Sequence, residues 1–285
     1  MQLTGVRIML KFKTPEVKQQ RLKILVYGAM GSGKSTLACS FPYTAYVDTE
    51  DSTSKIQYAK TIAEMGGAVL NTGDLDEIIA QVKELISTKH NFKTIVIDSL
   101  TVAYEHAMIE GEKKVGSDYG RHISYADNKT KQLTNLLLRA DMNCIVTCQA
   151  KREYGDGMKV IGDTYVGYKR LGYIFDLVFE TSVLGRSFTA VVRKSRLRSF
   201  KTGDEVQFNY NEIMRMCEQE VKDSAPVPIT LATDEQIKEM HRLIKLLNIS
   251  EEIITKWYVK ETVDTFEEMD TIAIAKYLTA MQKKI

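Results

Sequence analysis

An α/β fold with a mostly parallel central sheet is predicted by three features of this sequence. Strand-like and helix-like stretches alternate along residues 22–221, and such alternation is typical of parallel sheets with crossover helices. The glycine-rich stretch 28–35 separates an apolar, strand-like run at 22–27 from a helix-like run. A further β-prone run at 94–97 ends in Asp98. Because ligands of such folds bind at the carboxyl ends of the strands, functional residues are expected at that edge.

The remaining elements of this region follow from hydrophobic periodicity. Apolar residues at helical spacing predict helices over Thr53–Met65, Leu75–Ser87, Val102–Lys114, Ile123–Arg139 and Asn211–Val221. Two strand-like stretches at Leu177–Val183 and Phe188–Arg193, with Gly185 between them, predict an antiparallel extension of the sheet. Glycines within Ala150–Gly167 interrupt any regular pattern and predict a flexible loop there.

The C-terminal residues form a separate pattern. Lys222–Leu231 contains Pro226 and Pro228 and is predicted to be a linker. Thr233 begins a helix with acidic residues in its first turn, and further helices are predicted around Glu251–Val259, Phe266–Met269 and Thr271–Lys283. Trp257, the only tryptophan, is expected in the core of this bundle. The predicted organisation is an N-terminal arm at 1–21, a core at 22–221, a linker at 222–232 and a helical domain at 233–285.

The stretch 28–35 matches the phosphate-binding motif G-x-x-x-x-G-K-[ST] without a mismatch. Its glycines let the backbone wrap a triphosphate, and successive N–H groups hold the negative charge. Lys34 is expected to reach the β- and γ-phosphates, and Ser35 to offer its hydroxyl to Mg²⁺. The alternative is a chance glycine-rich turn, which the strand–helix context disfavours. The predicted nucleotide-binding residues are therefore Gly28, Ala29, Met30, Gly31, Ser32, Gly33, Lys34, Ser35 and Thr36.

Two strand ends supply carboxylates that complete such a site. Asp98 is expected to hold the Mg²⁺ through its water shell. The next residue is Ser99, so the glutamate that directly follows this aspartate in many AAA-type ATPases is missing. Glu50 follows another predicted strand, Ala45–Asp48, and is expected to face the γ-phosphate as general base. The structural alternative is that Glu50 only begins the helix predicted at Thr53–Met65.

Bulk composition excludes several classes of protein. The chain has 285 residues, of which 44% are hydrophobic, enough for one sizeable core and a small appendage. Its longest apolar runs are strand-sized and its first residues lack the apolar stretch of a signal peptide, so neither membrane insertion nor secretion is expected. The four cysteines form no C-x-x-C pair, and such usage fits a reducing cytoplasm.

A basic block stands out against a nearly neutral chain. The net charge is +2, but residues 150–201 carry eleven Lys or Arg against five Asp or Glu, which leaves +6. Such a block suggests a polyanion partner, and tyrosines interleave with it as expected where unpaired bases stack beside a phosphate-tracking groove. The alternative is the solvated face of a β-hairpin. The DNA-binding candidates in this block are Lys151, Arg152, Lys159, Lys169 and Arg170.

Over residues 20–200 these motifs resemble the cores of RecA-type recombinases. In that family a strand ends in Asp-x-Glu and the Glu activates water, which is similar to Asp48–Glu50 here. The family also has a Tyr-Ala-basic sequence whose tyrosine stacks on the adenine of the nucleotide. The resemblance implies that role for Tyr58; the alternative is that Tyr58 is a half-buried aromatic residue of a helix. In the same family another strand ends in a glutamine that senses the γ-phosphate, and a mobile DNA-binding loop begins after it. Gln149 resembles this glutamine, and Ala150–Gly167 resembles the loop.

The same resemblance implies further contacts. The family has an acidic, glycine-containing DNA loop after its Asp-Ser strand, similar to residues 110–114, which adds Lys113 and Lys114 to the DNA-binding candidates. The family also has a basic–Asn–basic strand whose charges reach the neighbouring subunit's nucleotide. Residues 191–196 resemble it, which implies that Lys194 and Arg196 act on a neighbour as arginine fingers do.

Among phage proteins, a short core with a small helical tail resembles RecA-like single-strand annealing ATPases. That resemblance implies ATP and Mg²⁺ as cofactors, single-stranded DNA as partner, self-association into a filament or ring, and hydrolysis at subunit interfaces. It also implies a docking role for the C-terminal helices, toward DNA or a single-strand-binding protein, in the cytoplasm of a bacterial host. The predicted function is ATP-dependent annealing or homologous recombination.

Two other classes stay open. Small-molecule kinases also use Gly-Ser-Gly-Lys-Ser-Thr, with Arg193–Arg198 as a phosphate-clamping lid, but kinases of this size rarely carry an appended helical bundle. A hexameric helicase-type motor or loader shares the core and has its DNA loops in the same region. The sequence also leaves open annealing against strand exchange, ring against filament, and ATP against another nucleoside triphosphate.

Overall fold

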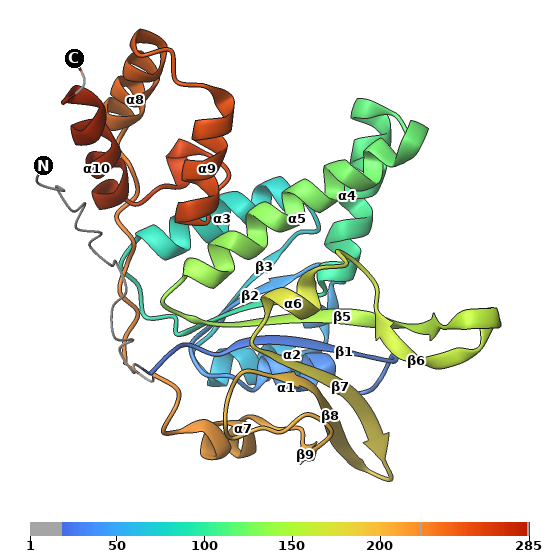
Figure 1. The fold of residues 1–285 in the computed structure, drawn as a ribbon. Helices are drawn as coiled ribbons and strands as arrows, with labels where there is room; N and C mark the ends of the chain where they lie inside the picture. Colours follow the sequence, from blue (N-terminus) through green and yellow to red (C-terminus); the bar gives the residue numbers. More distant parts are fainter. Residues whose placement is uncertain (1–18, 223, 284) are drawn as a thin grey trace, which may run out of the picture.

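A computed structural model describes residues 19–222, 224–283 and 285 of the chain, so most of the predicted arm at 1–21 lies outside the described residues. Within them, nine strands form one sheet in the order β3-β2-β4-β5-β1-β7-β8-β9, with β6 paired to β5 beside that path (Figure 1). The neighbours from β3 to β7 run parallel, whereas β8 and β9 are antiparallel additions. The strands are β1 (Lys23–Gly28), β2 (Thr44–Asp48), β3 (Ala68–Asn71), β4 (Thr94–Asp98), β5 (Asn143–Tyr154), β6 (Val160–Tyr165), β7 (Leu177–Leu184), β8 (Ser187–Ser195) and β9 (Glu205–Gln207).

The helices lie close to the predicted ranges, although α7 ends at Cys217 and not at the predicted Val221, and the start of α2 also differs. There a short 3₁₀ turn at Ser52–Ser54 precedes the helix, which starts only at Ile56. The helices are α1 (Lys34–Cys39), α2 (Ile56–Glu64), α3 (Leu75–Ser87), α4 (Leu100–Val115), α5 (Arg121–Arg139), α6 (Leu171–Ile174), α7 (Tyr210–Cys217), α8 (Asp234–Leu246), α9 (Glu251–Glu261) and α10 (Thr271–Gln282).

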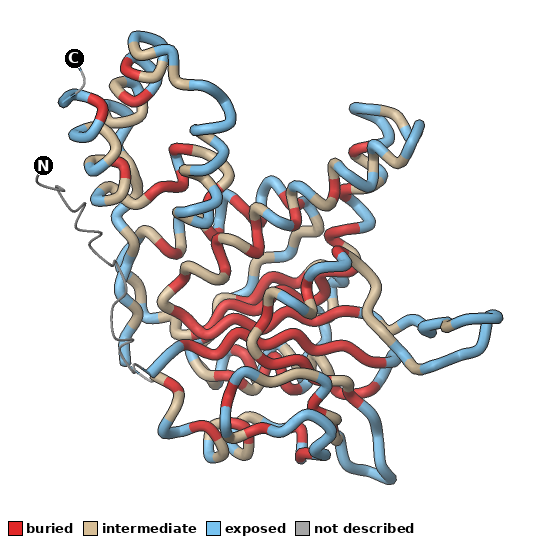
Figure 2. Tube along the Cα trace, viewed as in Figure 1, coloured by how far each residue is buried: buried red, intermediate tan, exposed pale blue. Residues whose placement is uncertain are grey.

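Alternation along the buried strands sends side chains to two apolar clusters, one on each face of the sheet. In β1, Leu25 and Tyr27 join the cluster under α3, α4 and α5, whereas Ile24 and Val26 join the cluster under α1, α2 and α7. Strands buried on both faces carry near-continuous apolar runs, which explains the sequences of β1 and β4. Figure 2 shows these buried strands at the centre of the molecule. The structure confirms the predicted α/β class with a mostly parallel sheet and a helical C-terminal part.

The segment predicted as a flexible loop at Ala150–Gly167 is instead a β-hairpin, so that prediction was wrong. β5 continues through Tyr154 and pairs antiparallel with β6. The glycines do not break the strands, because Gly157, with φ of 69°, lies at the tip, and a register shift beside Glu153 absorbs the remaining irregularity, as a β-bulge does. In Figure 1 the hairpin projects well beyond the sheet.

The resemblance also implied a loop at residues 110–114, and this prediction was wrong, because α4 continues through these residues to Val115. Gly111 lies buried in this helix, and a Cβ there would lie 2.9 Å from the ring of Tyr125 and 3.0 Å from a backbone oxygen of α5. The glycine therefore serves the close packing of α4 on α5. The turn between the helices falls at 116–120, and Figure 1 shows that this helical hairpin also projects from the body.

Helices α8, α9 and α10 surround a third apolar cluster in the C-terminal part. Trp257 packs beside it against Tyr277, with ring centroids 5.0 Å apart. Glu268, which is fully buried, docks this part on the sheet domain. Its carboxylate pairs with Lys83 of α3 at 3.1 Å and accepts a hydrogen bond from Gln132 of α5. None of the described helices is long and apolar enough to cross a membrane.

Candidate nucleotide-binding site

The parallel register brings four strand residues to one edge of the sheet. Gly28, which ends β1, lies beside Gln149 of β5, and Asp48, which ends β2, lies beside Asp98 of β4. Because β4 and β5 are neighbours, the four positions are adjacent. The glycine-rich loop, Glu50 and the β5–β6 hairpin all continue the chain from this edge. The glycine-rich loop, Glu50, Asp98 and Gln149 therefore meet in one place, whereas Tyr58 lies apart on α2.

The glycine-rich loop contains two positions where only glycine fits. A Cβ on Gly28 would lie 2.1 Å from the hydroxyl oxygen of Thr181 in neighbouring β7. Gly33 has φ of 91°, and a Cβ there would lie 2.6 Å from the ring of Phe188. Ser32 braces the loop, because its hydroxyl oxygen lies 2.6 Å from that of Thr181. The motif is thus folded as the tight turn between strand and helix that a phosphate-binding loop requires.

Lys34, the first residue of α1, lies near two carboxylates. Its Nζ donates hydrogen bonds to the carbonyl oxygens of Gly28 and Ala29 at 2.9 and 2.8 Å. Burial lowers the pKa of Lys34, and the negative charges of Asp98 and Glu50 act in the opposite direction. The lysine is therefore held over the loop with its positive charge beside the proposed metal ligand and the proposed base.

Asp98 is fixed by two buried hydroxyl groups. Tyr46 donates to one carboxylate oxygen and Thr147 to the other. Burial raises the pKa of Tyr46 and the charge of Asp98 raises it further, so the phenol stays protonated as a donor. A fixed carboxylate suits Mg²⁺, which prefers oxygen ligands. Sequence reasoning missed Tyr46 and Thr147. Each lies two residues before a residue of the motifs described above, Asp48 of the Asp-x-Glu pattern or Gln149, on the same face of its strand.

Glu50 is held between two neighbouring strand ends. Its Oε1 accepts hydrogen bonds from Ser99 Oγ at 2.7 Å and from Gln149 Nε2 at 3.1 Å. The side chain is exposed, as a group that meets a bound ligand and a water molecule must be. Since α2 starts only at Ile56, the alternative role of a helix-starting residue is disfavoured.

Asp48 fixes the turn that presents Glu50. Its carboxylate accepts hydrogen bonds from the N–H groups of Glu50 and Ser52, both at 3.1 Å, and from the N–H and hydroxyl of Thr53, both at 2.6 Å. Burial by itself raises the pKa of Asp48, but these hydrogen bonds outweigh burial and hold the pKa below its usual range. Asp48 is thus a buried, ionised residue that positions its neighbour.

The other predicted nucleotide contacts lie in the loop, in α1 and in α2. Met30 is fully exposed at the loop, and Ser35 and Thr36 follow Lys34 in the first turn of α1. Tyr58 lies on α2, where its half-buried ring packs against the apolar cluster under α1 and α2. This matches the alternative expectation of a half-buried helix aromatic for Tyr58.

The predicted DNA-binding residues fall on the two projections and on the segment after β6. All seven are exposed: Lys151, Arg152 and Lys159 on the β-hairpin, Lys169 and Arg170 before α6, and Lys113 and Lys114 near the end of α4. Among the interleaved aromatics, Tyr154 and Tyr173 are exposed, whereas Tyr168 and Phe200 are buried and pack in the core.

Lys194 and Arg196 lie at the opposite edge of the sheet from the glycine-rich loop. β8 runs antiparallel to β7, so the end of β8 lies beside the start of β7, whereas Gly28 lies beside Thr181 further along β7. Lys194 donates to three backbone carbonyl oxygens in and after α6, and Arg196 pairs with Asp176 at 2.9 Å. The structure therefore does not bring these two residues to the loop of their own chain.

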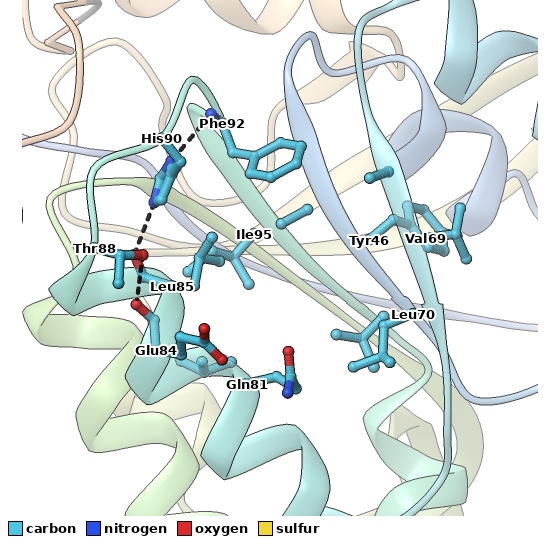
Figure 3. Close-up of a pocket in the computed structure, with 14 residues that line it drawn as sticks. Tyr46, Val69, Leu70, Gln81, Glu84, Leu85, Thr88, His90, Phe92 and Ile95 are labelled. Atoms are coloured by element: carbon cyan, nitrogen blue, oxygen red, sulfur yellow. Dashed lines mark hydrogen bonds between the residues drawn. The ribbon is translucent and has the colours of Figure 1, made fainter.

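A separate apolar cavity of about 320 Å³ lies between the edge strand β3 and α3 (Figure 3). His90 closes one side, with Nε2 2.8 Å from the Leu85 carbonyl oxygen. The cavity is lined by neither the glycine-rich loop nor Glu50, Asp98 or Gln149, so it is not the nucleotide site. Its apolar lining includes Val47, Val69, Leu70, Leu85, Phe92 and Ile95.

The chain is similar to solved structures and to one protein family model. The solved RadB recombinase is similar over 66% of this chain and 86% of its own, at 20% identity and a TM-score of 0.45. A KaiC-like protein from the hyperthermophilic archaeon Pyrococcus horikoshii OT3 is similar over 65% of this chain and 84% of its own, at 15% identity and a TM-score of 0.43. No curated protein matches the chain. Residues 20–208 match the family model described as AAA domain. The chain therefore belongs to the AAA domain family, and its core is an α/β fold with a mostly parallel sheet and a glycine-rich P-loop at residues 28–35.

Proposed function

We propose that this protein is an ATP-dependent, single-stranded-DNA-binding protein that promotes annealing or homologous recombination and hydrolyses ATP at subunit interfaces. The observation that carries the proposal is the hydrogen bond between Gln149 and Glu50. Gln149 touches the proposed general base, and it is also the residue at which β5 leaves the buried sheet and enters the exposed hairpin. A movement of Gln149 when the nucleotide changes would therefore be passed along the backbone of β5 to the proposed DNA-binding surface.

Each residue of the site has a proposed task in hydrolysis. The loop backbone and Lys34 bind the phosphates of ATP, and Ser35 and Asp98 supply oxygen ligands for Mg²⁺ and its waters. The bound Mg²⁺ would supply neutralisation of the charge that develops on the phosphate oxygens. Glu50 orients the attacking water and accepts its proton. Gln149 senses the γ-phosphate from its place beside Glu50.

The β5–β6 hairpin carries side chains of the kinds that bind unpaired strands. Lys151, Arg152 and Lys159 are exposed on it, and the exposed ring of Tyr154 offers a stacking face. Three acidic residues balance these charges, so residues 150–167 have no net charge and the +6 of the basic block comes from residues 168–201. Phosphate attraction together with base stacking is the chemistry by which proteins bind unpaired strands without reading sequence. The α4–α5 projection adds Lys113 and Lys114 and the fully exposed Tyr119.

Assembly is proposed because two basic residues lie away from the glycine-rich loop of their own chain, and to act on a neighbour they must leave the contacts that they make within it. Lys194 and Arg196 stand at the edge opposite the P-loop, so they are distant from the triphosphate of their own chain. A head-to-tail contact would place that edge against the P-loop edge of the next protomer. Such contacts generate rings when the rotation closes and helical filaments when it does not.

The small-molecule kinase is less well supported. In a kinase, Arg193–Arg198 would have to form the lid that clamps the phosphates. However, β8 continues to Ser195 within the sheet, and Arg196 is paired with Asp176. A helicase-type motor shares every feature of the proposed site and differs in assembly and movement on DNA. Electron microscopy with and without single-stranded DNA separates a closed ring from a filament.

The test is ATP hydrolysis with and without a single-stranded oligonucleotide. We expect the DNA to raise kcat, and we expect Lys34→Ala to abolish turnover because it removes the charge on the β- and γ-phosphates. The exposed Lys89→Ala variant, between α3 and β4, is the matched control and should behave as wild type. Stimulation by a sugar or nucleoside but not by DNA would contradict the proposal and favour the kinase.

A further inference from the structure

A buried threonine connects the nucleotide site to both strands of the β-hairpin. Thr101 lies in the first turn of α4 and is 0% exposed. Its Oγ1 accepts a hydrogen bond from the Gln149 N–H at 3.0 Å and donates one to the Val166 carbonyl oxygen at 2.8 Å. The Val166 N–H donates in turn to the Gln149 carbonyl oxygen at 2.8 Å. One hydroxyl group therefore closes the root of the hairpin from outside it.

The helix that carries Thr101 begins at the proposed catalytic carboxylates. Ser99, immediately before α4, donates to the Glu50 carboxylate at 2.7 Å, and Gln149 donates to the same oxygen at 3.1 Å. Thr101 then ties the backbone of Gln149 back to α4. The contacts form a closed circuit through Glu50, Gln149, Thr101 and Ser99. A shift of the Gln149 side chain toward or away from a γ-phosphate must therefore be accommodated at Thr101.

We propose that Thr101 is a positioning residue that couples the nucleotide bound at the P-loop to the geometry of the β5–β6 hairpin. This inference rests on the proposed function. Buried backbone groups keep hydrogen-bond partners wherever they can, so the hydroxyl makes Gln149 and Val166 move together relative to α4. Without it, the root of the hairpin keeps the Val166–Gln149 bond and the β5–β6 pairing but loses this tie to α4, so it can shift relative to the start of that helix.

A purely structural role predicts a different result from coupling. Loss of a buried hydroxyl that merely stabilises the fold lowers stability but leaves the DNA affinity dependent on the nucleotide. Loss of a coupling residue removes that dependence even in molecules that are folded and bind nucleotide. The decisive quantity is therefore the ratio of DNA affinities in two nucleotide states.

The experiment compares Thr101→Val, which keeps the shape and removes the hydroxyl, with Thr101→Ser, which restores it. Thr134→Val is the matched control, because Thr134 is also fully buried but its hydroxyl bonds only within α5, to Lys131. The Kd for a fluorescent oligothymidine is measured with a non-hydrolysable ATP analogue and with ADP. We expect the two Kd values to differ by about tenfold in wild type, Thr101→Ser and Thr134→Val, and by less than about twofold in Thr101→Val.

Three outcomes are informative. If Thr101→Val binds both nucleotides and keeps the wild-type ratio, the inference is wrong and the proposed function stands. If wild-type ATPase activity does not respond to single-stranded DNA, the proposed function fails and the inference fails with it. If Thr101→Val does not fold, hydrogen exchange in the wild-type protein decides. The ATP analogue must then change amide protection at both Gln149 and Val166 relative to ADP, and a change at Gln149 alone overturns the inference.

Discussion

Replacement of Glu50 by glutamine tests the proposed general base with little disturbance of the fold. Glu50 is exposed, and a glutamine oxygen can still accept the hydrogen bonds from Ser99 and Gln149. The free energy of unfolding should therefore change by less than about 0.5 kcal/mol. Loss of a general base should slow hydrolysis by about 100-fold or more, which raises the activation barrier by at least about 2.7 kcal/mol. The effect on catalysis should thus far exceed the effect on stability.

The assay is single-turnover ATP hydrolysis in the presence of single-stranded DNA, with the Kd of a fluorescent ATP analogue and the urea midpoint measured on the same samples. The Kd should stay within about threefold of wild type, because the loop and Lys34 are unchanged. Glu64→Gln is the control, since Glu64 is an exposed carboxylate on α2 that pairs only loosely with Lys60 at 3.7 Å. Normal turnover by Glu50→Gln with normal binding would refute the assignment. Asp48 would not inherit the role, because its carboxylate is fully engaged by the turn.

Three further predictions follow from the contacts described. Asp48→Asn should lower the free energy of unfolding by about 2–4 kcal/mol at pH 7, because a charged acceptor of several N–H bonds is lost. Since folding lowers the pKa of Asp48, its contribution is present above the unfolded pKa of about 3.9 and is lost as the pH falls through the lower folded value. Urea titrations of variant and wild type should therefore converge below about pH 4, and a constant difference would mean that the charge is unimportant. Lys151→Ala with Arg152→Ala should flatten the log–log salt dependence of DNA binding by about two units, and an unchanged slope would place the DNA elsewhere. Mixing Arg196→Ala with Lys34→Ala protein should recover hydrolysis at interfaces that contain both wild-type halves, whereas co-assembly without recovery would exclude a role in trans.

The placement of the nucleotide site could be predicted from the sequence because parallel sheets impose it. The motif at 28–35 fixes where the phosphates bind, and strands that end in Asp48 and Asp98 must end at the same edge once the sheet is parallel. The position of Glu50 in the site can also be predicted, because Glu50 comes two residues after Asp48 in the sequence. The side chains that orient these groups could not be found in this way. Tyr46 looks like a core aromatic in the sequence, and only the register shows that its hydroxyl reaches the carboxylate of Asp98.

The hairpin and its root could not be predicted, because they depend on contacts between distant residues. The two strands of the hairpin carry glycines and charges that read as a loop, and their pairing becomes favourable only when β5 is already held in the sheet. Thr101 resembles any threonine in the first turn of a helix. Its two partners lie 48 and 65 residues away in the sequence, and no local pattern indicates that a single hydroxyl meets both.

Because residues 150–165 form a paired hairpin and not a flexible loop, a signal from the nucleotide would travel along them as along one body. β5 is one continuous strand whose first half, to Cys148, is buried between β1 and β4, and whose second half, from Gln149, is exposed on the projection. A flexible loop would let each basic side chain find its own phosphate, so a change at Gln149 would fade within a few residues. A paired ribbon instead moves as a unit, because its cross-strand hydrogen bonds fix the spacing of its residues. A tilt of β5 at Gln149 would therefore move Lys151 and Arg152 together relative to the bound strand. This is why closure of the hairpin root, more than the number of charges on it, should decide whether DNA affinity follows the nucleotide.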